Sequence, residues 1–78
     1  ITLVEIQGHT DKQGRASSNK RLSQARADAV KAYLVSKGIE AARLEAIGYG
    51  EEQLLDDGDT EEIHANNRRV QFMVKVQE

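Results

Sequence analysis

The 78-residue sequence contains no cysteine and no proline, and it has only three aromatic residues. Without cysteine, a disulfide scaffold and thiolate chemistry are both excluded. No apolar run approaches the ~20 residues that a membrane-spanning helix needs, so we expect no membrane span in this chain. The chain begins at Ile1 without a Met, as an excised piece of a longer protein does. The lack of a targeting segment therefore carries no information on location.

Charge and aromatic content argue against a nucleic-acid partner. The net charge is −2, and the basic residues are scattered among acidic ones instead of forming one patch. Binding of single strands by base stacking needs more aromatic side chains than Tyr33, Tyr49 and Phe72. With 31% charged and 38% apolar residues, the sequence predicts one small globular domain over residues 1–78, with a thin core.

The hydrophobic pattern predicts a strand, an amphipathic helix and a second strand, which together form a βαβ unit. The two strands are expected to be parallel. We expect Ser17, Ser18 or Asn19 to cap the helix, which ends where Gly38 and Ile39 fit a Schellman motif. Thr60 is expected to cap one or two helical turns. The expected elements are strand 1–7, loop 11–18, helix 18–37, strand 43–47, acidic loop 51–60 and strand 69–77.

The last strand has the clearest alternation in the chain. Alternate residues of a strand face opposite sides of the sheet, so one apolar set faces one way and a mixed set faces the other. We expect the apolar set to lie inside; it consists of Val70, Phe72, Val74 and Val76.

The loop before the helix and the helix itself place a carboxylate and a guanidinium near each other. Asp11 lies in a loop rich in Gly and Ser, directly after the first strand. At about 100° per residue, the apolar stripe of the helix is formed by Leu22, Ala29, Val30 and Tyr33, and Arg26 falls in its middle. A charge in an apolar stripe must be paired or must serve a ligand, because a lone desolvated charge is very costly.

Two interpretations of the Asp11 and Arg26 pair remain open. A carboxylate and a guanidinium at fixed separation suit a zwitterion, since the first takes an ammonium and the second takes a carboxylate with two hydrogen bonds. Alternatively, the two residues form an internal salt bridge that pins the loop, and the domain serves as a protein–protein interaction module.

Metal-binding and hydrolytic sites find little support. His9 and His64 belong to no helical metal-ligand motif, and the acidic loop lacks the alternating ligands of an EF-hand. His9 is expected to orient the loop or to pack at the strand end. No Gly-x-Ser-x-Gly motif and no obvious acid–base carboxylate pair are present. The sequence therefore predicts a domain that is not an enzyme, with no metal and no cofactor.

A longer set of residues resembles the signature of the OmpA-like peptidoglycan-binding domain. This family includes outer membrane protein A, the peptidoglycan-associated lipoprotein and flagellar motor protein B. The resemblance covers nearly the whole chain in the family's order and spacing. It runs through Gly8-His9-Thr10-Asp11, Gly14, Asn19, Leu22-Ser23, Arg26-Ala27, Tyr33-Leu34, Gly38-Ile39, Arg43, Gly48-Tyr49-Gly50-Glu51 and Asn67-Arg68-Arg69-Val70.

The resemblance implies non-covalent binding of the cell-wall stem peptide at its diaminopimelate residue. It also implies a location in the periplasm, as part of an outer-membrane or envelope-anchored protein. It implies that Asp11 holds the diaminopimelate ammonium and Arg26 its carboxylate. Thr10, Asn19 and Arg68 are implied as supporting contacts.

The resemblance also implies the fold class: α/β, a two-layer βαβ-type sandwich with helices on one face of a mixed sheet. Family domains usually begin with another strand and helix, so Ile1 corresponds to the start of their second strand. The sequence therefore predicts a truncated domain with an uncovered sheet edge, through which it self-associates. A second departure lies at Gln53-Leu54-Leu55, where the family usually has a Pro.

Overall fold

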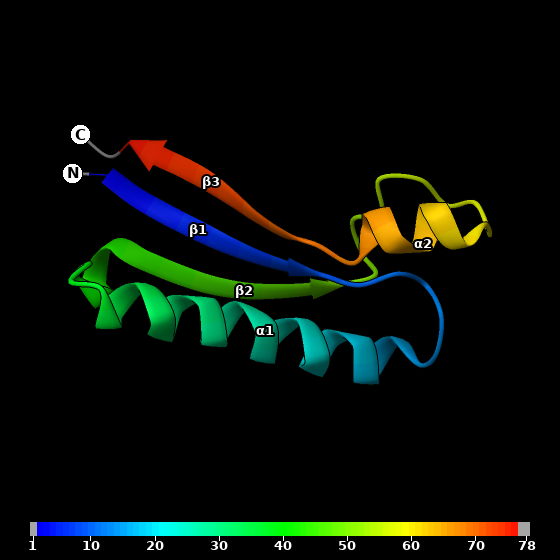
Figure 1. The fold of residues 1–78 in the computed structure, drawn as a ribbon, viewed down its shortest axis with the longest axis horizontal. Helices are drawn as coiled ribbons and strands as arrows, with labels where there is room; N and C mark the ends of the chain where they lie inside the picture. The colour runs from blue at the N-terminus through cyan, green and yellow to red at the C-terminus, as the bar shows by residue number, and fades with distance from the viewer. Residues whose placement is uncertain (1, 77–78) are drawn as a thin grey trace.

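A computed structural model describes residues 2–76, which form a mixed three-stranded sheet with helices (Figure 1). The expected strands at both ends included Ile1 and Gln77, which lie outside the described residues. The elements, in chain order, are β1 (Thr2–His9), α1 (Ala16–Ser36), the 3-10 turn η1 (Ala41–Arg43), β2 (Leu44–Gly50), α2 (Glu61–Asn67) and β3 (Val70–Val76).

Strand β1 lies in the middle of the sheet, in the order β2-β1-β3. It pairs in parallel with β2, with Ile6 opposite Ala46, and antiparallel with β3, with Ile6 opposite Phe72. The parallel first pair and the mixed α/β sheet are confirmed. The carboxyl ends of β1 and β2 and the start of β3 therefore meet at one end of the sheet.

Helix α1 covers one face of the sheet, along β2 and β1, whereas α2 lies beyond the end of the strands (Figure 1). The backbone of α1 approaches the strands closely at two glycines. A Cβ on Gly8 would lie 2.1 Å from the Ser23 carbonyl oxygen, and a Cβ on Gly48 would lie 2.3 Å from the Gln24 nitrogen. Only glycine fits at these two positions. The close approach places α1 directly over the sheet near the carboxyl ends of β1 and β2.

The two ends of α1 differ in how well the sequence predicted them. The carboxyl end is confirmed as a Schellman motif: Gly38 has φ +99°, and Ile39 N–H donates to Leu34 O at 3.2 Å. At the amino end, the predicted capping by a Ser or Asn side chain is wrong. The helix begins at Ala16, and the cap residue Arg15 makes no side-chain capping bond.

The predicted apolar stripe of α1 is wrong for Leu22, Ala29 and Tyr33, which are exposed, whereas Val30 is half-buried and packs against the core. The buried residues of α1 are Asn19, Ser23 and Ala27, whereas Leu22 is 45% exposed and Tyr33 61% exposed. Small side chains form the packed stripe because the close approach at the glycines leaves no room for large ones. Arg26 lies beside this stripe and is exposed.

The predicted burial of the alternating set on β3 is wrong for Phe72, Val74 and Val76, whereas Val70 is half-buried and packs against the core. Val70, Phe72, Val74 and Val76 do share one face with Val4 and Ile6, as their pairing requires. Yet Phe72 is 56% and Val76 is 76% exposed, because α1 lies over β2 and β1 and leaves β3 bare. Within residues 2–76, the fully buried apolar residues are Ile6, Ala27 and Leu44, and half-buried apolar residues pack against them: Val4, Val30, Leu34, Ala46 and Val70.

No helix within residues 2–76 is both long and apolar enough to cross a membrane.

Candidate functional site

The candidate site lies where the chain leaves β1. The backbone N–H of His9 donates to Arg69 O at 2.9 Å, and that of Thr10 donates to Gly50 O at 2.9 Å. These bonds tie the exit of β1 to β2 on one side and to the start of β3 on the other. Asp11 is therefore placed at the sheet end by the strands themselves.

The Asp11 carboxylate is buried and oriented by two donors. Its side chain is only 9% exposed. One oxygen, Oδ1, accepts from the backbone N–H of Gln13 at 2.9 Å, and the other, Oδ2, accepts from Arg68 Nη1 at 2.8 Å. Burial is the largest influence on the pKa of Asp11 and would raise it. The bonds from Gln13 and Arg68 together outweigh burial and hold the pKa below its ordinary value.

Thr10 and Asn19 hold the loop that carries Asp11. Thr10 Oγ1 donates to the backbone oxygen of Asp11 at 2.9 Å. The Asn19 side-chain amide donates to the same oxygen at 3.3 Å and to Gln13 O at 2.9 Å. Both side chains are buried, so the loop between β1 and α1 is fixed from within.

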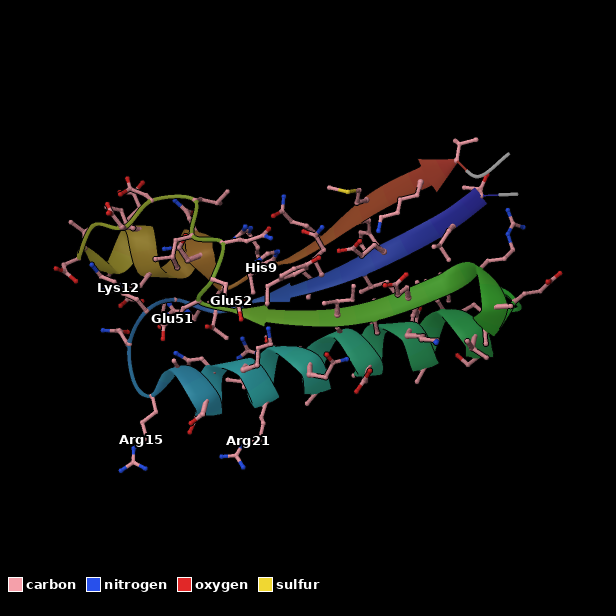
Figure 2. The ribbon with its side chains drawn as sticks, turned by 180° about the vertical axis from the view of Figure 1, so that it is seen from behind. His9, Lys12, Arg15, Arg21, Glu51 and Glu52 are labelled. Atoms are coloured by element: carbon pink, nitrogen blue, oxygen red, sulfur yellow. The ribbon has the colours of Figure 1, made fainter. Side chains whose placement is uncertain are left out.

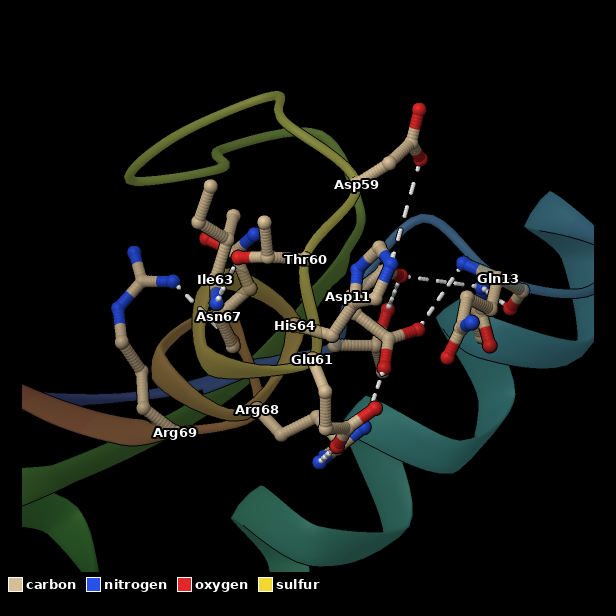
Figure 3. Close-up of polar contacts among 12 residues, drawn as sticks. Asp11, Gln13, Asp59, Thr60, Glu61, Ile63, His64, Asn67, Arg68 and Arg69 are labelled. Atoms are coloured by element: carbon tan, nitrogen blue, oxygen red, sulfur yellow. Dashed lines mark hydrogen bonds and ion pairs between the residues drawn. The ribbon is translucent and has the colours of Figure 1, made fainter.

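Arg68 follows α2 and bridges two acidic residues. Its Nη1 contacts Asp11, and its Nη2 contacts Glu61 Oε1 at 2.6 Å (Figure 3). The bonds to Glu61 and Asp11 raise the pKa of the Arg68 guanidinium, so it stays charged. The expected ion pair between Asp11 and Arg26 is absent from the described part of the chain, because Arg68 takes that place. The reading of Asp11 and Arg26 as an internal salt bridge is wrong.

Arg26 makes no hydrogen bond or ion pair within residues 2–76, and it lies on the same side of α1 as Asn19. The seven residues from Asn19 to Arg26 correspond to nearly two full turns, or about 10 Å along the helix. Side chains of a helix lean toward its amino end, so the Arg26 side chain leans toward the Asp11 loop. By contrast, Arg15, which precedes α1, and Arg21 of α1 extend away from the strands (Figure 2).

The acidic loop between β2 and α2 is tied to the site from both ends. The buried Asn67 side chain accepts from Leu55 N–H at 2.8 Å and donates to Asp56 O at 2.9 Å. Lys12 of the first loop pairs with Asp59 at 3.3 Å. The start of α2 is confirmed, since Thr60 Oγ1 accepts from Ile63 N–H at 3.2 Å.

The two histidines lie near the site. His9 is fully buried, as expected of a residue packed at the strand end, and stacks on Tyr49 with ring centroids 5.4 Å apart. Burial, aided by the charge of Arg69, lowers the pKa of His9. His64 is 4% exposed, and its Nε2 lies 4.0 Å from Asp59 Oδ1. Across the described residues, no three His, Cys, Asp or Glu side chains gather as metal ligands would.

Of the five residues expected at the site, the structure brings four together: Asp11, Thr10, Asn19 and Arg68. Arg26 lies about two helical turns from Asn19 along α1. Sequence reasoning missed the contacts of Glu61 and Asn67. The spacing of Glu61 and Arg68 was a usable signal, because seven residues return to the same side of a helix. Nothing in the sequence pattern indicated that Asn67 would hold the acidic loop.

Known proteins share this fold and sequence. The chain is 47% identical to outer membrane porin F of Pseudomonas fluorescens, over 97% of the chain and 23% of that protein. It is 43% identical to the peptidoglycan-associated lipoprotein of Pseudomonas aeruginosa, over 88% of the chain and 41% of that protein. The crystal structure of the peptidoglycan-associated lipoprotein from Burkholderia pseudomallei superposes with a TM-score of 0.91 at 35% identity, over 95% of the chain and 63% of that structure.

The chain thus spans less than two thirds of each of these relatives. A model of the OmpA family matches residues 1–68, which include Asp11, Arg26 and Arg68. The chain belongs to the OmpA family.

Proposed function

We propose that this domain binds peptidoglycan non-covalently, through the diaminopimelate of the stem peptide. Asp11 takes the ammonium at the side-chain end of diaminopimelate, and Arg26 takes the carboxylate on the same carbon. Thr10, Asn19 and Arg68 support the two. The observation that carries the proposal is the buried Asp11 carboxylate, which the chain orients with two donors and leaves with unused acceptor capacity.

The unused capacity follows from simple counting. An ionised carboxylate has about four lone-pair sites on its two oxygens. Within residues 2–76, each Asp11 oxygen accepts one hydrogen bond. An ammonium group, which brings three donors and no acceptor, can take up the remaining sites. A buried, fixed acceptor loses little entropy on binding, which favours affinity.

The ligand carboxylate is assigned to Arg26 because Arg68 is already occupied. Both terminal nitrogens of Arg68 contact acids of the chain. Arg26 lies on the Asp11 side of α1, is exposed and has no ion-pair partner among the described residues. A guanidinium of this kind binds a carboxylate with two parallel hydrogen bonds.

The relatives support a binding role. One of them is a peptidoglycan-associated lipoprotein, and another is an outer membrane porin. As a member of the OmpA family, the chain is not an enzyme. We propose that it acts in the periplasm, where it anchors a larger envelope protein or the outer membrane to the wall.

Co-sedimentation with isolated peptidoglycan tests the proposal. We expect the chain to sediment with the wall, and Asp11→Asn and Arg26→Ala to stay in the supernatant. Arg21→Ala is the matched control, because Arg21 is another exposed arginine of α1 that points away from the strands (Figure 2). Binding by folded Arg26→Ala protein at the level of the Arg21→Ala protein would contradict the role of Arg26. Release of soluble fragments from the pellet would indicate an enzyme instead.

The second candidate is a protein–protein interaction module. The observation that favours it is the exposed apolar side of β3, which we call the open apolar face; it consists of Phe72, Val74 and Val76, which alternate along one face of the strand. Exposed apolar patches mark interaction sites. A chain that associates through this face but does not sediment with peptidoglycan would favour this candidate.

A further inference from the structure

We infer that Glu61 is a positioning residue for the ammonium end of the ligand. By holding one arm of Arg68, it prevents full pairing of Arg68 with Asp11 and keeps the Asp11 carboxylate available to a cation. The inference rests on the proposed function, because it concerns the same site.

The geometry of Arg68 carries the inference. A guanidinium commonly binds one carboxylate through two parallel hydrogen bonds. Arg68 instead divides its terminal nitrogens: Nη1 lies 2.8 Å from Asp11 Oδ2, and Nη2 lies 2.6 Å from Glu61 Oε1 (Figure 3). Asp11 therefore receives a single hydrogen bond from Arg68. Within residues 2–76, Glu61 is the hydrogen-bond partner of Nη2, so without Glu61 that arm would be free to turn toward Asp11.

The local charge balance leads to the same conclusion. Asp11, Glu61 and Arg68 form a group of two negative charges and one positive charge, with a net charge of −1. The other charged pair next to the loop, Lys12 with Asp59, is balanced. A net negative site favours an ammonium ligand over a neutral one. Neutralising Glu61 would leave Asp11 and Arg68 as a balanced pair, with which an ammonium would have to compete.

The position of Glu61 makes its effect separable from folding. Its side chain is 73% exposed. Within the described residues, its one side-chain hydrogen bond is the bond from Arg68. Surface ion pairs of this kind contribute little to stability. The next residue, Glu62, is also acidic and exposed, lies in the same first turn of α2 and has no ion pair within residues 2–76. Glu62 is thus a matched control for the loss of one negative charge.

The experiment measures affinity by calorimetry on the whole 78-residue chain. The probe is a stem tripeptide that contains diaminopimelate, with its distal amine free or acetylated. We expect Glu61→Gln to weaken binding of the free-amine peptide by about two- to fivefold, as the loss of an exposed charge pair predicts. It should also reduce the preference for the free amine over the acetylated one. Glu62→Gln should remain within twofold of the unmodified chain.

A second background tests whether Glu61 acts through Arg68. In Arg68→Gln protein, the added Glu61→Gln change should have a clearly smaller effect on affinity, because only the through-space effect of the lost charge remains. Equal or tighter binding by Glu61→Gln protein would overturn the inference and leave the proposed function standing. An undiminished effect in the Arg68→Gln background would also overturn it. Failure of the unmodified chain to bind the free-amine peptide would overturn the proposed function, and the inference with it.

Discussion

The site end of the molecule and the open apolar face differ in how far their side chains are buried and contacted by the rest of the chain. At the site end, the polar groups of Thr10, Asp11 and Asn19 are buried and satisfied by partners a few residues away or on the adjoining elements. On the open apolar face, Phe72 and Val76 project from a well-paired strand with nothing above them among the described residues. The site residues are thus held in place by partners within the chain, whereas the open apolar face has no cover within residues 2–76.

The difference follows from the range of the two kinds of interaction. A hydrogen bond needs one partner at about 2.9 Å, which a turn or a helix end supplies locally. Apolar burial needs area, at roughly 25 cal/mol per Å² removed from water, and a single helix over three strands supplies little of it. A polar site can therefore be finished in a small domain whose apolar core is thin.

The largest expected effect tests this contrast through stability. Ile6→Ala removes a fully buried side chain from the core, so we expect a loss of about 2–5 kcal/mol in the free energy of unfolding. Phe72→Ala removes a larger side chain from the opposite position on β3, yet it should cost about 0.5 kcal/mol or less in the monomer, because Phe72 is exposed. Urea unfolding at low protein concentration measures both.

Comparable losses for the two variants would break the contrast, since they would mean that Phe72 is buried in solution. A loss confined to high protein concentration would assign the burial of Phe72 to a second copy of the chain.

The next prediction concerns Arg26, an exposed residue of α1 that is proposed to complete the site. A stem tripeptide that carries diaminopimelate should compete with peptidoglycan about tenfold better than the same tripeptide with lysine in that position, as expected if one charge-assisted contact is lost. Peptides are compared because the α-amine is then amidated, so lysine offers no ammonium and carboxylate on one carbon. Lysine supplies an ammonium for Asp11 but has no carboxylate at that end for Arg26. Competition is measured by co-sedimentation at increasing ligand concentration. Equal competition by the lysine peptide would show that Arg26 binds no ligand carboxylate.

Elements with strong local signals could be predicted from the sequence. The Schellman end at Gly38 and the capping at Thr60 follow from residues next to one another in the chain. The parallel β1–β2 pair follows from the order of the elements. The role proposed for Asp11 came from its place after a strand and from the family resemblance.

What failed depends on packing that the pattern does not contain. Periodicity located an apolar stripe on α1, but the glycines at positions 8 and 48 rotate the helix so that Ser23 and Ala27 face the sheet. The alternation of β3 identified its apolar face without saying whether anything covers it. The sequence pattern offered Arg26 as the ion-pair partner of Asp11, and it missed Arg68. Arg68 comes close because the start of β3 pairs with the exit of β1, where His9 N–H donates to Arg69 O.

A smaller effect is expected from acid. The pKa of Glu5 is lowered, chiefly by its hydrogen bonds from Lys75 and Tyr49, and that of Asp11 is lowered despite its burial. Carboxyl groups with a lowered pKa stabilise the folded state above their unfolded pKa of about 4, and this stabilisation is lost as pH falls toward the folded value. We expect the melting temperature to drop below about pH 4, and to drop less in Asp11→Asn protein.

Protonation of His9 is expected to reduce stability at a higher pH than protonation of the carboxyl groups does, so the two effects can be told apart. Its pKa is lowered from 6.5 by burial first, so the folded state disfavours protonated His9. Stability should begin to fall as pH drops through about 6.5 and should level off below the folded pKa. A melting temperature that is flat from pH 7 to pH 5 would contradict this role of His9.

The smallest expected effect is concentration-dependent self-association through the open apolar face. Strand β3 pairs only with β1 among the described residues, so its outer edge presents unpaired backbone groups next to exposed Val74. Unpaired edges and apolar patches both favour pairing with another chain. We expect the weight-average mass in analytical ultracentrifugation to rise with concentration, and the melting temperature to rise with it. Val74→Lys should abolish both trends, because a lysine on an edge strand opposes pairing. Leu55→Lys, which changes an equally exposed apolar residue outside the face, should keep both. A monomer at every concentration, with a constant and high melting temperature, would show that the thin core of Ile6, Ala27 and Leu44 suffices alone.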